Sequence, residues 1–165
     1  MAIEIERKFL LRGQSWRRHV HATQSLAQGY LGGDRSSVRV RVNGTEARLS
    51  IKSKVRGSTR LEFEYPIPMA DAQILLRELA GAEVIKTRHL VRHGEHLWEL
   101  DEFTGANSGL LIAEIELDRV DQAFERPNWL GREVTDEQRF YNAALVQSPF
   151  CNWIDRAAII EELAC

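Results

Sequence analysis

The stretch Ile3-Glu4-Ile5-Glu6-Arg7-Lys8-Phe9 begins the chain with charged and apolar residues in near alternation. Successive side chains of a β-strand point to opposite faces, so the even-numbered residues of this stretch would share one face. That face carries Glu4, Glu6 and Lys8, whereas the opposite face is mostly apolar. The stretch therefore predicts a strand with one ionic face and one apolar face.

The same alternation recurs along the chain in five further segments, which are Val38–Val42, Ile51–Lys54, Leu61–Tyr65, Ile85–Arg88 and Ala113–Leu117. One such strand is ordinarily half-buried, with its charges facing water. Here whole strands carry either acidic pairs or basic pairs, and like charges side by side repel each other. We therefore expect a bound ion or ligand to offset the repulsion, inside a barrel whose ionic face points inward.

Composition favours one globular domain over residues 1–165, because 44% of the 165 residues are hydrophobic and 28% are charged. The formal net charge of -2 argues against a nucleic-acid-binding protein. Cys151 and Cys165 follow neither metal-ligand nor disulfide spacing, which fits a reducing cytosol. The sequence shows no basic, apolar leader and no apolar run of membrane-spanning length, so we expect a cytoplasmic protein without a membrane partner.

Eight strands are expected, at Ile3–Leu11, Gln24–Leu31, Ser37–Val42, Glu46–Lys54, Arg60–Ile67, Glu83–Arg92, His96–Phe103 and Leu110–Leu117. The turns between them favour an antiparallel meander. Asn43-Gly44 is the strongest hairpin signal, because both central turn residues must tolerate positive φ. Helices are expected at Met69–Leu79, after a capping box at Thr135–Gln138, at Trp153–Leu163 and, as short pieces, at Ser15–His19 and Asp121–Glu125.

The charged faces supply two kinds of group. Carboxylates offer the oxygen ligands that Mg²⁺ or Mn²⁺ prefer; they are Glu4, Glu6, Glu114 and Glu116. Guanidinium and ammonium groups suit phosphate oxygens; they come from Arg39, Arg41, Lys52, Lys54, Lys86 and Arg88. Together such groups suit phosphoryl transfer, because metal ions and cations neutralise the charge that develops as a terminal phosphoryl group leaves.

These motifs resemble one known family. Glu4-Ile5-Glu6-Arg7-Lys8 matches the ExExK motif of the CYTH superfamily, the triphosphate tunnel metalloenzymes, and the resemblance covers nearly the whole chain. The later ionic pairs follow the family's order, as Arg39/Arg41, Lys52/Lys54, Glu62/Glu64, Lys86/Arg88 and Glu114/Glu116. The resemblance implies an α+β fold, with a closed eight-stranded antiparallel β-barrel, a charged lumen and flanking helices. Such a tunnel binds a linear triphosphate and a divalent metal.

The resemblance also implies roles for individual residues. The metal ligands would be Glu4, Glu6 and Glu116, assisted by Glu114. The phosphate-binding residues would be Lys8, Arg39, Arg41, Lys52, Lys86 and Arg88, with Lys54 ranked below Lys52. Lys86, Asp101 and Glu64 would act in catalysis, with Asp101 near the metal or the attacking water. Tyr30 is a candidate substrate contact.

The compact bacterial members that this chain resembles are often inorganic tripolyphosphatases, so hydrolysis of tripolyphosphate to pyrophosphate and phosphate is the expected activity. Three alternatives remain open: an adenylate cyclase that makes cyclic AMP, a thiamine triphosphatase, and a noncatalytic sensor of polyphosphate or nucleotide. The sequence reveals no convincing nucleobase pocket at a tunnel mouth. The expected partner is a triphosphate-containing small molecule, and a homodimer is a further expectation.

Overall fold

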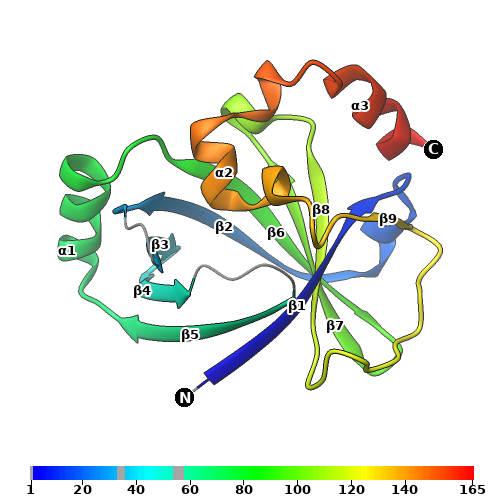
Figure 1. The fold of residues 1–165 in the computed structure, drawn as a ribbon, viewed down its shortest axis with the longest axis horizontal. Coiled ribbons are helices and arrows are strands. Elements are labelled where there is room, and N and C mark those ends of the chain that lie inside the picture. The colour runs from blue at the N-terminus through cyan, green and yellow to red at the C-terminus, as the bar shows by residue number, and fades with distance from the viewer. Residues whose placement is uncertain (1, 33–35, 54–57) are drawn as a thin grey trace.

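The computed structural model describes residues 2–32, 36–53 and 58–165. Nine strands form one antiparallel sheet: β1 (Ala2–Leu11), β2 (Val20–Tyr30), β3 (Ser36–Asn43), β4 (Glu46–Ser53), β5 (Thr59–Pro66), β6 (Val84–His93), β7 (His96–Phe103), β8 (Leu111–Glu116) and β9 (Leu130–Glu133). Their order is β5-β4-β3-β2-β6-β7-β8-β1-β9, and a further pairing of β5 with β1 closes the first eight into a barrel (Figure 1). The predicted eight-stranded antiparallel barrel is confirmed.

Strand β1 closes the barrel because it pairs on both edges. Its first half pairs with β5, from Ala2 opposite Glu62 to Ile5 opposite Thr59. Its second half pairs with β8, and β9 adds to its other edge near Phe9. The predicted meander is therefore wrong in part. Strands β2 to β5 and β6 to β8 are meanders, but β1 lies between β5 and β8, and β2 pairs with β6. This arrangement leaves no open edge in the barrel.

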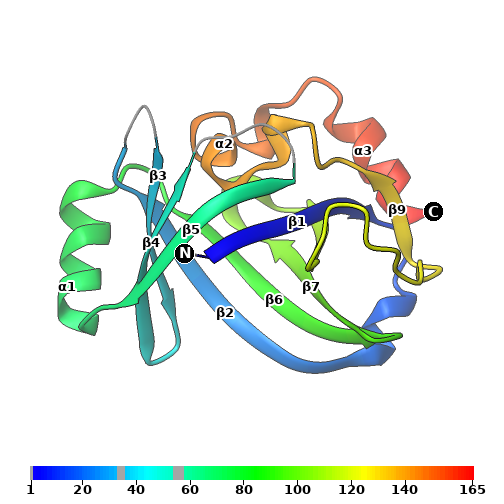
Figure 2. The same ribbon diagram turned by 60° about the horizontal axis from the view of Figure 1, so that its bottom comes forward.

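Helices flank the barrel on two sides. Helix α1 (Met69–Ile74) continues as the π-helical turn η2 (Leu75–Leu79) and covers the outside of β3 and β4, whereas α2 (Asn142–Gln147) and α3 (Arg156–Ala164) lie toward the other end (Figure 2). The remaining helical turns are η1 (Ser15–His19), η3 (Gly105–Asn107), η4 (Gln138–Phe140) and η5 (Phe150–Asn152). Within the described ranges, every helix is too short or too polar to cross a membrane.

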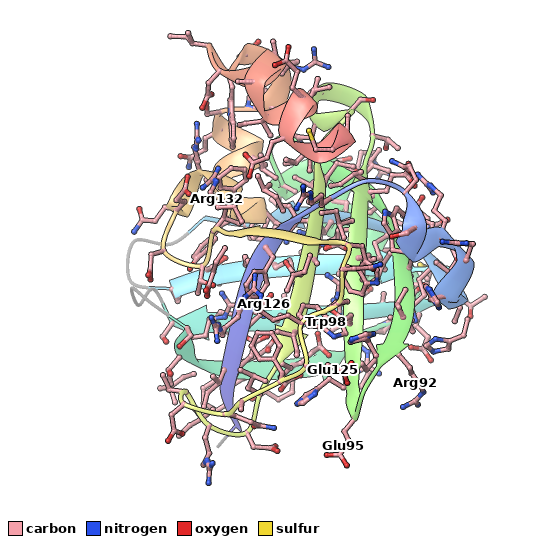
Figure 3. The ribbon with its side chains drawn as sticks, turned by 90° about the vertical axis from the view of Figure 1, so that its right-hand side faces the viewer. Arg92, Glu95, Trp98, Glu125, Arg126 and Arg132 are labelled. Atoms are coloured by element: carbon pink, nitrogen blue, oxygen red, sulfur yellow. The ribbon has the colours of Figure 1, made fainter. Side chains whose placement is uncertain are left out.

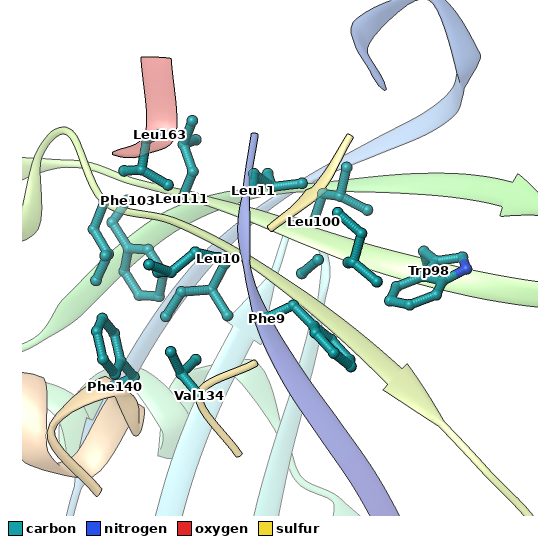
Figure 4. Packing of buried hydrophobic residues seen from close by; sticks show 14 of the residues in the cluster. Phe9, Leu10, Leu11, Trp98, Leu100, Phe103, Leu111, Val134, Phe140 and Leu163 are labelled. Carbon is teal, nitrogen blue, oxygen red and sulfur yellow. The ribbon is translucent and has the colours of Figure 1, made fainter. Parts of the chain in front are cut away.

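The main apolar core lies between the outer barrel wall and the C-terminal segments. Figure 4 shows part of it, with Phe9 of β1 near Trp98 of β7. The Trp98 ring packs edge-to-face on Phe9, Phe124 and Trp129, with centroids 5.9, 5.5 and 5.4 Å away. Phe124 belongs to the segment that crosses this side of the barrel, where Figure 3 labels its neighbours Glu125 and Arg126. Outer-wall packing of this kind leaves the inner faces free for polar groups.

The ionic stretch of the tunnel ends in apolar contacts. The strand faces that carry Lys8 and Glu114 continue to Leu10 and Ile112, which are register partners and almost fully buried. Both belong to the main core, together with Phe140 from the turn before α2. Charge therefore occupies only one part of each strand's inner face, and apolar side chains close the rest.

Three local predictions differ from the structure. The capping box at Thr135 does not begin a helix, because its hydroxyl accepts a hydrogen bond from the Lys8 amide at 3.0 Å and donates to Glu133 Oε1 at 2.7 Å. Helix α2 begins seven residues later, at Asn142. Residues Asp121–Glu125 are not helical. In the β3–β4 hairpin, Asn43 is the last residue of β3 and pairs with Glu46, so the two turn residues are Gly44 and Thr45. Of the two predicted turn residues, Gly44 takes positive φ, 56°, and Asn43 does not.

Gly131 supports a test of the β1–β9 contact. A Cβ atom at this position would lie 2.8 Å from the Leu10 carbonyl oxygen, whereas a Cβ at Gly81 would meet nothing within 4 Å. We expect Gly131→Ala to lower the free energy of unfolding by about 1–3 kcal/mol, because backbone must move to admit the methyl group. Gly81→Ala is the control. Urea denaturation of both variants checks this, and equal stabilities would contradict it.

Candidate functional site

A cavity of about 1120 Å³ occupies the barrel interior. Charged side chains of β1 and of β3 to β8 line it; they are Glu4, Glu6, Lys8, Arg39, Arg41, Lys52, Arg60, Glu62, Glu64, Arg88, Glu99, Glu114 and Glu116. The alternation that predicted an inward ionic face thus holds for the described strands. Lys54, predicted as a minor phosphate contact, lies outside the described residues.

Opposite charges adjoin in much of this lining. Most of the lining charges belong to one chain of ion pairs, which we call the ion-pair chain: Lys52, Glu4, Arg60, Glu6, Lys8, Glu114, Arg88, Asp101 and Lys86. Like charges adjoin along some strands, as predicted, as in Arg39 and Arg41 of β3 or Glu114 and Glu116 of β8. Opposite charges meet between other strands, as in Lys52 with Glu62 and Arg88 with Asp101, so much of the expected repulsion is offset inside the protein.

The first half of the ion-pair chain joins β1 to β4 and β5. Lys52 Nζ donates to Glu4 Oε1 at 2.8 Å, and Arg60 Nε donates to Glu4 Oε2 at 2.5 Å. Burial alone would raise the pKa of Glu4, but the charges and hydrogen bonds of Lys52 and Arg60 outweigh it and lower the pKa to about 2. Glu4 is therefore ionised at neutral pH.

Arg60 was missed in the sequence. It also donates to Glu6, and it stands opposite Glu4 in the β1–β5 register. The signal was present, since Arg60 has the same strand parity as Glu62 and Glu64. The recognised alternation began one residue too late, at Leu61.

The second half of the ion-pair chain is more deeply buried. Lys8 Nζ lies 2.6 Å from Glu6 Oε1 and also donates to Glu114. Arg88 donates to Glu114 at 2.9 Å and holds both oxygens of Asp101 at 2.7 Å. Burial raises the pKa of Glu114, but Lys8 and the nearby cations outweigh it and hold that pKa well below the ordinary value.

Lys86 and Asp101 lie behind this surface. They are 2% and 0% exposed, they pair with each other, and neither lines the cavity. Burial lowers the pKa of Lys86 to about 8 despite its neighbour Asp101. Their catalytic role stays a prediction. Both side chains are buried outside the cavity lining, and Asp101 contacts Arg88, which does line the cavity.

A second cluster surrounds Glu64 and joins the ion-pair chain through Arg39, Glu62 and Lys52. This carboxylate accepts hydrogen bonds from Arg41 at 3.0 Å, Ser50 at 2.9 Å and Arg48 at 3.2 Å. Burial raises the pKa of Glu64, but the Ser50 hydrogen bond and the arginine charges outweigh it and lower the pKa. Ser50 in turn accepts a hydrogen bond from Arg39 at 3.1 Å. Glu64 therefore orients the two lining arginines while remaining ionised.

Two register pairs bring carboxylates together, namely Glu6 with Glu116 and Glu99 with Glu114. Burial, with neighbouring carboxylates, raises the pKa values of Glu99 and Glu116. All-oxygen donors of this kind fit a hard divalent cation. Among the described residues, however, no three acidic, histidine or cysteine side chains converge around one point. Lys8 and Arg60 instead contact Glu6, one of the predicted metal ligands.

Neutral side chains line the cavity beside α2. They include Tyr30, which was a candidate substrate contact, and the residues Gln138, Tyr141, Asn142 and Gln147, which sequence reasoning missed. The Lys8 ammonium lies 5.6 Å from the Tyr141 ring centroid. The four missed residues come from a C-terminal segment whose packing against the barrel cannot be read from strand periodicity. A distant part of the chain thus supplies amide groups to the cavity.

The model of the CYTH domain matches residues 2–142. The chain belongs to the CYTH family. An inorganic triphosphatase of Acetivibrio thermocellus is 41% identical over 155 residues, covering 93% of this chain and 99% of that protein. An inorganic triphosphatase of Nitrosomonas europaea is 39% identical over 154 residues, covering 88% and 97%. Enzymes of this family generally depend on a metal ion.

A solved structure gives the same result for the fold. The crystal structure of the inorganic triphosphatase NE1496 superposes with a TM-score of 0.62 at 36% identity, covering 90% of this chain and 97% of that one. The PH1012 protein from Pyrococcus horikoshii has a TM-score of 0.55 at 17% identity, covering 72% and 81%. The second likeness concerns the fold alone.

The Glu4 ion pairs predict a pH-dependent stability. Because the pKa of folded Glu4, about 2, lies below its ordinary value of 4.5, ionised Glu4 stabilises the fold above pH 4.5. That contribution is lost as the pH falls from 4.5 toward 2. We expect wild type to melt several degrees above Glu4→Gln at pH 6 and the gap to shrink toward zero near pH 2.5, measured by circular dichroism. Glu83→Gln, at an exposed position, is the control, and a pH-independent gap would contradict this prediction.

Proposed function

We propose that this chain is a metal-dependent hydrolase that cleaves inorganic tripolyphosphate to pyrophosphate and phosphate. The observation that carries the proposal is the cavity inside the barrel, which is lined by both cations and carboxylates. The relatives named inorganic triphosphatase, at 39% and 41% identity over nearly their whole length, support it. We also propose that residues 1–165 form one tunnel domain, since α3 packs into the same core as β1.

The lining cations would bind the phosphate chain. Arg39 and Arg41 present guanidinium groups from β3, and Lys8, Lys52 and Arg88 face them from other strands. Guanidinium forks bind phosphate oxygens in pairs, whereas ammonium groups act as point charges. A linear triphosphate carries negative charge along its whole length, so cations from several strands match it better than a single cluster would. Lys54 is proposed as a further contact.

Glu4, Glu6, Glu114 and Glu116 would hold Mg²⁺ or Mn²⁺ through carboxylate oxygens. When bound, the ion would neutralise phosphate charge and make the attacking water more acidic. The lining carboxylates would lie beside the attacking water, and the arginines would lie beside the phosphate groups. Water oxygen would add to the terminal phosphorus and give one proton to a lining carboxylate, the bond from that phosphorus to the bridging oxygen would break, and pyrophosphate would leave with its charge balanced by Arg39, Arg41 and Lys52.

The three residues predicted to be catalytic are now proposed as positioning residues. Asp101 fixes the Arg88 guanidinium through two hydrogen bonds, and Lys86 neutralises the Asp101 charge behind it. Glu64 holds Arg41 and Ser50. Each thereby orients a group that would contact substrate, which limits the reorganisation needed during the reaction.

A nucleoside triphosphate is the second candidate substrate, for hydrolysis or for cyclisation to cyclic AMP. The amides and tyrosines beside α2 favour it, because neutral hydrogen-bonding and aromatic groups suit a nucleoside better than another phosphate. Thiamine triphosphate and a sensor without turnover are further alternatives, and the homodimer remains a prediction.

A substrate panel tests the proposed activity. We expect phosphate release from tripolyphosphate with Mg²⁺ or Mn²⁺, loss of release on chelation, and restoration when the ion is returned. ATP and thiamine triphosphate are assayed in parallel, with cyclic AMP measured by chromatography. Fast release without any divalent ion, or binding of every triphosphate without turnover, would contradict the proposal.

Arg41→Gln tests the phosphate contacts. Arg41 lines the cavity and is held by Glu64, so its loss removes an oriented positive charge. We expect kcat/KM for tripolyphosphate to fall by about 10²–10³-fold. Arg132→Gln is the matched control, because Arg132 pairs with Glu137 and Glu162 outside the cavity. Equal losses of kcat/KM in both variants would contradict this prediction, because a charge in the tunnel would then matter no more than a charge outside it.

A further inference from the structure

We propose that Arg60 keeps the metal ion out of the tunnel until a triphosphate arrives, by holding Glu4 and Glu6 together with one guanidinium group. The inference rests on the proposed function of the tunnel and concerns how metal binding in it is regulated. Arg60 would thus be a positioning residue that couples the binding of metal to the binding of substrate.

The geometry shows a single side chain spanning two carboxylates. Arg60 Nε donates to Glu4 Oε2 at 2.5 Å, and its Nη2 donates to Glu6 Oε2. Lys52 takes Glu4 Oε1 at 2.8 Å, and Lys8 takes Glu6 Oε1 at 2.6 Å. Cations therefore contact every oxygen of the two carboxylates.

Arg60 differs from the two lysines in its place in the ion-pair chain. Lys52 pairs with Glu4 and also with Glu62, at 3.1 Å, and Lys8 pairs with Glu6 and also with Glu114. In the described part of the chain, only Arg60 pairs with both Glu4 and Glu6. Without it, the ion-pair chain would separate into two halves. Glu6 Oε2 would lose its cation, and Glu4 would keep only Lys52, which lies 2.8 and 2.9 Å from its two oxygens.

The backbone fixes Arg60 at this position. It lies opposite Glu4 in the pairing that closes the barrel, and the Glu6 amide donates to the Ser58 carbonyl at 2.9 Å on the same seam. The Arg60 side chain is 19% exposed, so it can exchange partners within the cavity without leaving it. Its charge is permanent, because the carboxylates raise the pKa of Arg60 further above its ordinary range.

A metal ion and a guanidinium group compete for the same carboxylate oxygens. A divalent cation that binds Glu4 and Glu6 must displace Arg60 and then lies beside its positive charge, which is unfavourable in a partly desolvated site. A phosphate oxygen offers the guanidinium fork an equally good partner. Triphosphate would therefore draw Arg60 from the carboxylates and open them to metal, and the two ligands would bind cooperatively.

Binding of Mn²⁺ alone, measured by isothermal titration calorimetry without any phosphate, tests this inference. We expect Arg60→Gln to bind Mn²⁺ about tenfold more tightly than wild type, the effect of removing one adjacent cation. Arg60→Lys, whose single ammonium reaches one carboxylate at a time, should bind about threefold more tightly. Arg7→Gln is the matched control. Arg7 lies on β1, the strand that carries Glu4 and Glu6, and forms two hydrogen bonds to Glu133 on the outer face of that strand.

Circular dichroism first establishes that each variant is folded, and if Arg60→Gln is not, Arg60→Lys decides. Unchanged Mn²⁺ affinity in the folded variants would overturn the inference, as would weaker binding or an absence of binding in wild type and variants alike. The outcome is separable from the proposed activity. If Arg60→Gln binds Mn²⁺ tenfold more tightly but wild type cleaves no triphosphate, the proposed function is refuted and the role of Arg60 stands. If wild type cleaves triphosphate but Arg60→Gln binds Mn²⁺ as wild type does, the proposed function stands and the role of Arg60 is refuted.

Discussion

The pairing of β1 with β5 and β8 is the interaction on which the rest of the structure depends. It turns a sheet with one ionic face into a tunnel, and it sets Glu4 opposite Arg60 and Lys8 opposite Glu114. A shift of one residue in this register would turn Glu4, Glu6 and Lys8 outward and bring Ile5 into the lumen. Barrel closure and site assembly are therefore the same event.

Closing the tunnel removes many charges from bulk water, which is unfavourable unless each charge finds a partner. The ion-pair chain supplies those partners, and it links β1 to β4, β5, β6, β7 and β8. Apolar side chains are buried elsewhere: on the outer wall around Trp98, beneath α1, and on the part of the inner face beyond the charges, around Leu10 and Ile112. The protein thus separates the packing that stabilises the fold from the charges that would do chemistry.

Strand periodicity predicted the part of the molecule in which side-chain direction follows from backbone alternation. All eight barrel strands and the inward direction of the described charged faces follow from it. It could not show which strands pair, because β1 meets β5 and β8 only through long-range contacts. The short strand β9, the Thr135 turn and the α2 side of the cavity depend on C-terminal packing. Arg60 was readable in principle, since it shares the parity of Glu62, and it was missed only at the strand boundary.

A site whose cations and carboxylates neutralise one another responds to ligands by exchange. An anion alone would take Arg60 or Lys52 from Glu4 and leave that carboxylate without its counter-ions. A cation alone would take Glu4 and leave the basic side chains unpaired inside the barrel wall. A ligand that brings phosphate and metal together replaces both partners at once, so no buried charge is left alone. We therefore expect the ion-pair chain to favour a metal–triphosphate complex over either component alone, by the same electrostatic rule that pairs the charges of the tunnel.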